Sequence, residues 1–206
     1  QKLQKQVDFL EANPEYVLAY QHAINQLEVK DEGGADRVQA NNKPGKIITW
    51  PKTLTIVYRN QINEYPAVFF QVPNADTFLL LTLRNLGRKE CIQVLRPAVR
   101  RLHAGGMWSM IDTAKRSKER FHSCLLMFDY FRGSYSQSKA KQELLKAFQG
   151  LVKELRSSGR PGKRVNTIAR SCLIMMSRGL GYEALRILLK KIARSLKFHT
   201  KQKLYS

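Results

Sequence analysis

The sequence predicts a mainly α-helical protein, a helical array with one small β-hairpin near residues 47–73. Three observations indicate this class. Apolar residues recur every three or four positions through most of the chain after Pro73. Alternating β-branched and aromatic residues are confined to the stretch before it. Of the 206 residues, 43% are hydrophobic and 25% charged, as in globular domains, so wholesale disorder is excluded.

The first thirty residues predict two helices. Leu3, Val7 and Leu10 have helical spacing. Asn13-Pro14 is typical of a helix cap followed by proline at the first helical position, so a second helix would extend to about residue 30. The glycine, asparagine and proline residues of Lys30–Lys46 then predict a loop.

A β-hairpin is the simplest interpretation of residues 47–73. Leu54, Ile56 and Tyr58 alternate with Thr53, Thr55 and Val57, which is the period of a strand. Ala67–Val72 supplies a second β-rich run, and Asn60–Tyr65 between them has the composition of a turn. Pro66 would stand at the start of the second strand, where a sheet tolerates proline.

After Pro73 the spacing predicts six helices: Asp76–Leu86, Lys89–His103, Met107–Phe131, Ser136–Arg156, Arg164–Arg178 and Tyr182–His199. The fifth has an apolar stripe from Val165 to Met176, and the sixth has one from Leu185 to Leu196. We expect both stripes to be buried.

Three glycines are regularly spaced, since Gly87, Gly133 and Gly179 lie 46 residues apart. Each follows an apolar helical run, where glycine in the left-handed conformation commonly ends a helix. A period of this length with two helices per unit is typical of HEAT-like stacked helix pairs. An irregular helical bundle with the same helices is the alternative.

The charge is large and uneven. The chain has 36 Lys and Arg against 16 Asp and Glu, a net charge of +20. Residues 1–75 have eight basic and eight acidic side chains, and residues 76–206 have 28 against 8. Because such self-repulsion is costly without a polyanion, we predict a charge-neutral segment, 1–75, that contacts protein neighbours, and a basic helical domain, 76–206, that contacts RNA.

The candidate RNA-binding residues fall in clusters along the basic part. In the last predicted helix five of them step by three or four residues along one face, with a rise near the spacing of successive phosphates. Others flank a Gly/Pro loop that opens a helix, where backbone N–H groups favour anions. The full set is Arg96, Arg100, Arg101, Lys115, Arg116, Lys118, Arg120, Arg132, Arg160, Lys163, Arg164, Arg186, Lys190, Arg194, Lys197 and Lys201.

The motifs of catalysis and cofactor binding are missing from the sequence. The three cysteines form no Cys-x-x-Cys pair, and His122 is not followed by the residues of a zinc deaminase. Residues 159–164 differ from a phosphate-binding P-loop, because Arg164 stands where the magnesium-binding hydroxyl would be. We therefore predict no enzymatic activity, no cofactor, no metal and no small-molecule substrate. Apolar runs are too short to span a membrane.

These observations favour a non-enzymatic RNA-binding scaffold of a ribonucleoprotein particle, such as a ribosome or a ribosome-assembly intermediate. Arginine enrichment suits structured RNA, and the motifs of sequence-specific DNA readers do not occur. The alternatives are a viral nucleoprotein-like RNA coat and a helical-repeat adaptor for acidic proteins.

We expect an intracellular protein, with the nucleus or nucleolus favoured over the cytoplasm or mitochondrion. The chain begins at Gln1 and not at methionine, so we also expect a preceding segment.

Overall fold

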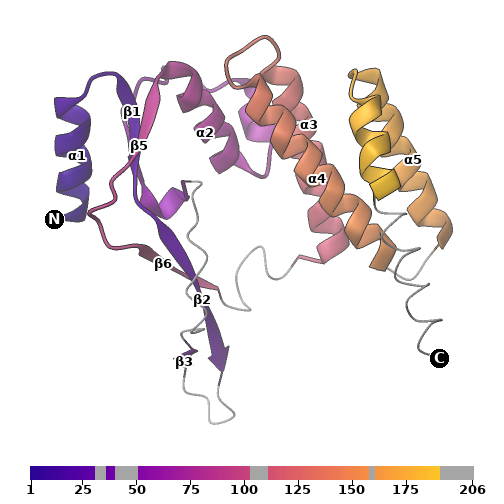
Figure 1. The fold of residues 1–206 in the computed structure, drawn as a ribbon, viewed down its shortest axis with the longest axis horizontal. Coiled ribbons are helices and arrows are strands. Elements are labelled where there is room, and N and C mark those ends of the chain that lie inside the picture. The colour runs from indigo at the N-terminus through magenta and orange to yellow at the C-terminus, as the bar shows by residue number, and fades with distance from the viewer. Residues whose placement is uncertain (31–35, 40–50, 103–110, 158–160, 191–206) are drawn as a thin grey trace. The chain divides into compact units, whose positions relative to one another are not determined.

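The computed structural model describes residues 1–30, 36–39, 51–102, 111–157 and 161–190 (Figure 1). It is mostly helical with two small three-stranded sheets, which confirms the mainly α class. The chain divides into a first unit, Gln1–Asp112 with Tyr130–Gln137, and a second unit, Thr113–Asp129 with Ser138–Ser206. The division that charge suggests at residue 75 therefore falls inside the first unit.

The first unit contains both sheets. Its elements are α1 (Lys2–Ala12), β1 (Tyr16–Tyr20), β2 (Ala23–Lys30), β3 (Asp36–Gln39), η1 (Thr53–Thr55), β4 (Ile56–Tyr58), η2 (Ala67–Gln71), α2 (Ala75–Leu86), β5 (Arg88–Cys91) and β6 (Ala98–Leu102). In one sheet β1 lies between antiparallel β4 and parallel β5. In the other, β2 lies between antiparallel β3 and parallel β6.

The helix expected between residues 14 and 30 is wrong, because this stretch forms β1 and β2. Asn13 ends α1, with its N–H donating to the Leu10 carbonyl, and Pro14 follows that end. In β1 the run from Val17 to Tyr20 is buried at every position, so it lacks the alternation that marks a half-buried strand. β3 likewise lies inside the expected loop Lys30–Lys46, most of which falls outside the described residues.

The helix expected at Lys89–His103 is also wrong, since β5 and β6 occupy it. Pro97 would remove a hydrogen bond from the middle of such a helix. As parallel strands, β5 and β6 pair with β1 and β2 in turn, and the Ile92 N–H donates to the Tyr20 carbonyl at 2.7 Å. The parallel pairing links residues about seventy positions apart.

The expected hairpin near residues 47–73 does not form over the part the structure describes, residues 51–73. β4 is a strand, but its partner is β1. Ala67–Gln71 is a 3-10 helix, in which the Phe69 N–H donates to the Pro66 carbonyl at 2.8 Å. Phe69 packs against Tyr65 and Phe78, with ring centroids 4.4 and 5.6 Å away, so this run contributes its rings to a local cluster and not to a sheet.

The core of the first unit lies on the sheet around β1. Figure 1 shows α1 on one side of β1 and β5, and α2 on the other. Leu80 and Leu83 of α2 pack on Val17 and Leu18. On the α1 side the buried Gln6 amide donates to the carbonyls of Ala19 and Thr55.

A second anchor is the turn at residues 130–137. Phe131 is buried 5.1 Å from the Phe78 ring. The buried Ser136 hydroxyl donates to the Leu81 carbonyl at 2.7 Å, and its N–H donates to the Asn85 side chain at 2.9 Å. These contacts fix the turn to α2, although more than forty residues separate them in sequence.

The second unit is built from helices over its described residues. These are α3 (Thr113–Tyr130), α4 (Gln137–Ser157), α5 (Pro161–Ser177) and a helical segment at residues 181–190, so four of the expected helices are confirmed within one to six residues at the ends that the structure describes. Phe121 of α3 packs on Phe148 of α4, with centroids 5.9 Å apart. Leu144, Phe148 and Leu151 are almost fully buried.

The last two helices bury faces that differ from the apolar stripes we expected to be buried. Over residues 166–177 of α5 the buried side chains are Ser171 and Met175, whereas Leu173 and Met176 are exposed. On the 181–190 segment Ala184 and Ile187 are buried, whereas Leu185 and Leu189 are exposed. Apolar side chains surround both helices on more than one face, so periodicity alone did not determine which face is buried.

The expected repeat of helix pairs is not confirmed. Gly133 and Gly179 have positive φ angles of 77° and 73°, as predicted for helix-ending glycines. Gly87 ends α2 in extended backbone instead, with φ 171°. Between Gly87 and Gly133 the chain forms β5, β6 and α3, so no second helix completes a repeat over its described residues.

Candidate nucleic-acid interface

The excess charge is concentrated in the second unit. Its residues include 21 Lys and Arg and five Asp and Glu, a net charge of +16, whereas the first unit has a net charge of +4. Because most of this charge lies on residues that the structure places in a small set of helices, the helix faces determine which cations a polyanion could reach.

The four predicted cations of α3 (Lys115, Arg116, Lys118 and Arg120) lie on different faces of the helix. Lys115, Lys118 and the neighbouring His122 are three and four residues apart, and all three are exposed on one side of the helix. Arg116 is half-buried, and Arg120 lies on another face beside Glu143. The sequence clustered four cations, and the structure brings only two of them to a common exposed face.

On the 181–190 segment Arg186 and Lys190 are one turn apart and exposed, as the predicted row requires. Its continuation at Arg194, Lys197 and Lys201 lies outside the described residues. Lys163 and Arg164 lie in the first turn of α5, which begins at Pro161, and Arg160 falls outside the described residues.

Four predicted residues belong to the first unit. Arg132 is exposed in the turn between α3 and α4. Arg100 and Arg101 lie on β6, opposite Asn25 and Gln26 of β2. Arg96 is exposed and lines a shallow hollow of about 320 Å³ together with Lys2 and Lys5 of α1, so it joins cations from the segment that we expected to be charge-neutral.

Some cations of the second unit are used in ion pairs. Glu143 of α4 lies 2.9 Å from Lys146, 3.5 Å from Lys139 and 3.6 Å from Arg120. Burial raises the pKa of the Glu143 carboxyl, but these three cations more than offset it and hold the pKa below its usual value. Lys141 pairs with Glu183 at 2.6 Å, and Lys115 pairs with Glu119 at 4.0 Å.

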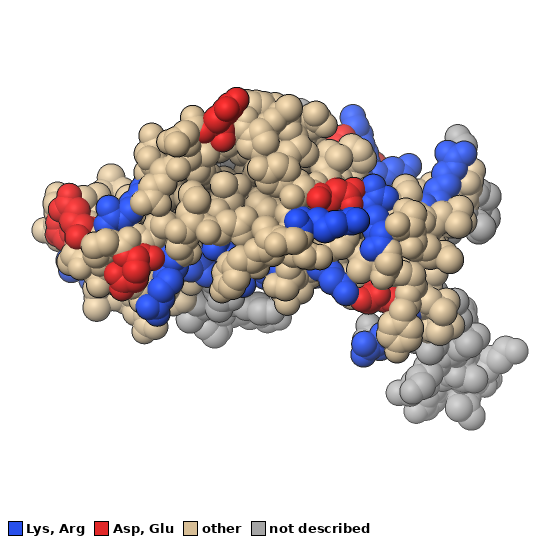
Figure 2. Space-filling model, turned by 90° about the horizontal axis from the view of Figure 1, so that it is seen from above, with Lys and Arg blue, Asp and Glu red and all other residues tan. Residues whose placement is uncertain are grey.

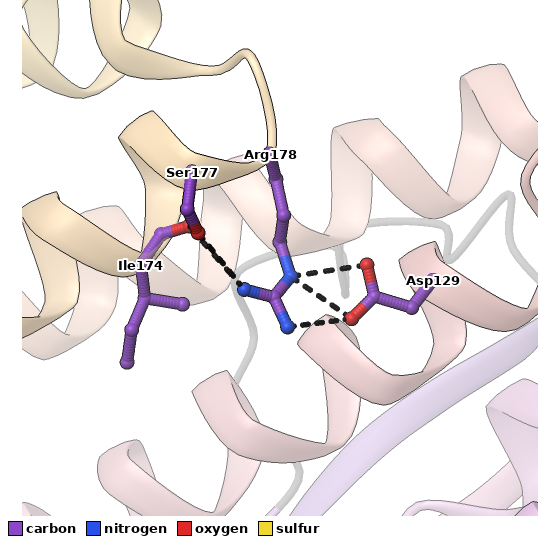
Figure 3. Close-up of polar contacts among 4 residues, drawn as sticks. All are labelled: Asp129, Ile174, Ser177 and Arg178. Carbon is purple, nitrogen blue, oxygen red and sulfur yellow. Dashed lines mark hydrogen bonds and ion pairs between the residues drawn. The ribbon is translucent and has the colours of Figure 1, made fainter.

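Arg178 is another cation with a structural partner. Its Nε and Nη2 donate to both oxygens of Asp129, at distances from 2.7 to 3.0 Å (Figure 3). Its Nη1 also contacts the Ser177 hydroxyl at 3.3 Å. This bidentate pair ties the end of α5 to the end of α3, so Arg178 has a structural role within the second unit.

The ion pairs do not remove the excess. Five acidic residues can neutralise only a minority of 21 cations, and the first unit has no surplus of acids to contribute. On the face drawn in Figure 2, basic side chains form several separate groups with acidic ones beside some of them. The basic side chains visible on this face therefore do not form one block.

Three further cations gather in the first unit. Arg84, Arg88 and Lys89 stand where α2 passes into β5, and each lies over a tyrosine ring, at 4.8 Å from Tyr135, 4.8 Å from Tyr16 and 5.7 Å from Tyr20 respectively. They are not among the residues predicted from sequence, because residue 89 was expected to start a helix. The signal available was Arg-x₃-Arg-Lys around a glycine.

One cysteine lies near a histidine. Cys91 Sγ is 3.5 Å from Nε2 and 3.8 Å from Nδ1 of His22, and burial raises the pKa of its thiol. An activated nucleophile needs a lowered pKa and one well-directed base, so this geometry does not fit a catalytic pair. Within the described ranges, no group of three or more His, Cys, Asp or Glu side chains could hold a metal ion.

Comparisons with known proteins gave no match, whether to protein-family models, to curated proteins or to solved structures. Over the described residues, none of the helices has the length and apolar character needed to cross a bilayer.

Proposed function

We propose that this protein is a non-enzymatic RNA-binding scaffold of a ribonucleoprotein particle, with the helices of its second unit lying along RNA phosphates. The observation that carries the proposal is the net charge of +16 on a unit whose acidic residues are mostly in ion pairs already. A polyanion is the partner that such a surplus suits best.

RNA is favoured over DNA by the arrangement of the cations. They are distributed over α3, α5 and residues 181–190 and do not line one recognition helix. Cations distributed in this way contact phosphates and recognise the shape of the RNA more than they read the edges of its bases. Neighbouring proteins, and a nuclear or nucleolar location, remain part of the proposal and would be tested by purifying the particle from fractionated cells.

The test is charge reversal on the 181–190 segment. The double variant Arg186→Glu/Lys190→Glu is expected to lower affinity for structured RNA by roughly tenfold or more at moderate salt, and to reduce the salt slope by about one for each phosphate that the variant no longer neutralises. Fluorescence anisotropy with labelled RNA measures both quantities.

The matched control retains the charge at both positions. Arg186→Lys/Lys190→Arg should bind within about twofold of the original protein, because phosphates respond to charge at these exposed sites. Circular dichroism and thermal unfolding would show that both variants keep the fold. Unchanged affinity in the charge-reversed variant would contradict the proposed surface.

A viral nucleoprotein-like RNA coat is a second candidate, favoured by one observation. Leu173, Met176, Tyr182, Leu185 and Leu189 are all more than half exposed on neighbouring segments of the second unit. Where exposed apolar side chains such as these form one contiguous patch, the patch commonly marks contact with another protein. Light scattering with and without RNA separates the two functions, since a coat assembles into multimers on RNA and a scaffold binds as one copy.

A further inference from the structure

The first unit contains a pocket of about 460 Å³ at the junction of α2 and β5. This volume lies within the range of small-molecule binding sites in proteins. All of its lining residues belong to the first unit: Val17, Leu18, Pro51, Leu80, Leu83, Arg84, Asn85, Leu86, Gly87, Arg88, Lys89 and Tyr135.

The lining of the pocket is apolar on one side. Val17 and Leu18 come from the central strand β1, and Leu80 and Leu83 come from the inner face of α2. All four are almost fully buried in the core, so their positions are fixed before any ligand arrives. A flat ring system placed on this lining would lose water from its apolar surface without disturbing the core.

The other side of the pocket is cationic and aromatic. Arg88 and Lys89 are exposed, and Arg84 lies over the ring of Tyr135, which is 72% exposed. None of the lining residues is acidic. Three positive charges around an apolar lining are complementary to an anion attached to a flat ring.

Two further donors are available at the same place. The Asn85 side chain accepts a hydrogen bond from Ser136 through its oxygen, which leaves its two N–H groups for another acceptor. The Nε of Arg84 is buried, and the described residues provide no hydrogen-bond partner for it. An unmatched donor beside a pocket is costly unless a ligand satisfies it.

We propose that this pocket binds one nucleoside monophosphate unit, with the base on the apolar lining and the phosphate at Arg84, Arg88 and Lys89. This unit is an unpaired nucleotide of bound RNA, and this step of the proposal rests on the proposed function. Tyr135 then lies at the edge of the site, where it can stack on the base or on a neighbour.

A titration of the labelled protein, residues 1–206, with adenosine monophosphate, and separately with adenosine, tests the site itself. Amide signals of Leu18, Leu83 and Gly87 should shift and saturate with the monophosphate, and adenosine should bind about fivefold more weakly for lack of the charged contact. The variant Arg88→Ala/Lys89→Ala should lose about fivefold in monophosphate affinity, whereas the control Lys153→Ala/Arg170→Ala, which removes two exposed cations of the second unit, should lose none.

A second arm tests the source of the nucleotide. The protein should prefer an RNA hairpin with one bulged adenosine over a fully paired hairpin by about fivefold, and Arg88→Ala/Lys89→Ala should abolish the preference. Binding of the monophosphate without any bulge preference would assign the pocket to free nucleotides and overturn the RNA source. No shift at millimolar monophosphate would overturn the pocket itself.

The two proposals fail separately. If the protein does not bind RNA even at low salt while the monophosphate still binds, the proposed function fails and the nucleotide pocket stands. If charge reversal abolishes RNA binding while the pocket residues never respond, the pocket fails and the RNA-binding function stands.

Discussion

Sequence alone predicted the structural roles of two glycines and missed the role of a third. Gly133 and Gly179 adopt the left-handed backbone expected of helix-ending glycines. Gly87 is required for a different reason, which no local pattern reveals. A Cβ atom there would lie 2.6 Å from Val17 Cγ1 and 3.0 Å from the Glu15 carbonyl oxygen, because β1 passes close to the end of α2. Only the tertiary structure places these residues side by side.

Gly87→Ala is therefore expected to destabilise the first unit by about 2 kcal/mol or more, since backbone atoms would have to shift. Gly150 is the matched control, because it lies within α4 with nothing within 4 Å of the added Cβ. Gly150→Ala should stabilise the protein by ~0.5–1 kcal/mol through helix propensity. Denaturant unfolding of both variants measures the difference, and equal effects would contradict the close approach.

Glu143 gives the second unit a predictable acid sensitivity. Because its pKa is lower in the folded protein than its usual value of 4.5, the carboxylate stabilises the fold at higher pH. That contribution is lost as pH falls from about 4.5 through the lowered pKa.

Glu143→Gln is expected to lower the free energy of unfolding by about 1 kcal/mol at neutral pH. The loss is modest because its partners Arg120 and Lys146 are half exposed. The variant should also lose less stability than the original protein when acidified. Unfolding free energies at pH 7 and pH 3 test this, with the exposed Glu64→Gln as control. Parallel pH profiles for the original protein and Glu143→Gln would contradict the account.

At the scale of elements, the sequence predicted long amphipathic helices well and buried strands poorly. α2, α3 and α4 match the expected helices within a few residues, apart from the start of α3. β1 was missed because all but its first position are buried, and a continuous apolar run carries no strand period. β5 and β6 depend on pairing with strands about seventy residues earlier, and such pairing is not visible in a local window.

The Arg178–Asp129 pair makes the attachment of α5 to α3 testable. Asp129→Asn keeps the shape of the side chain but removes its charge, so the free energy of unfolding of the second unit should fall by about 1–2 kcal/mol. The loss of a fully buried pair would cost more, but both of these side chains are partly exposed. Thermal unfolding measures the loss. The same substitution should leave RNA affinity within about twofold, since a scaffold cation is not a phosphate contact; a large fall in affinity without unfolding would show that Arg178 binds RNA.

At the scale of the whole molecule, composition gives the net charge of the candidate site but not which of its cations share a face. The net charge and its concentration toward the carboxyl-terminal part follow from counting. Which cations share a face does not, because Arg120 is next to Glu143 in space and 23 residues from it in sequence. The cations beside the pocket were missed for the same reason, since α2 and β5 bring them to tyrosines that the sequence places far away.

The salt dependence of RNA binding tests the central claim, that the surplus cations of the second unit neutralise phosphates, most directly. The logarithm of the affinity should fall linearly with the logarithm of salt concentration, by about 0.7 for each single-strand phosphate contacted and by similar amounts for unrelated RNA sequences. With cations on at least three helical segments, we expect a slope that corresponds to several phosphates. An affinity that does not change with salt, or the absence of RNA binding at low salt, would contradict the account.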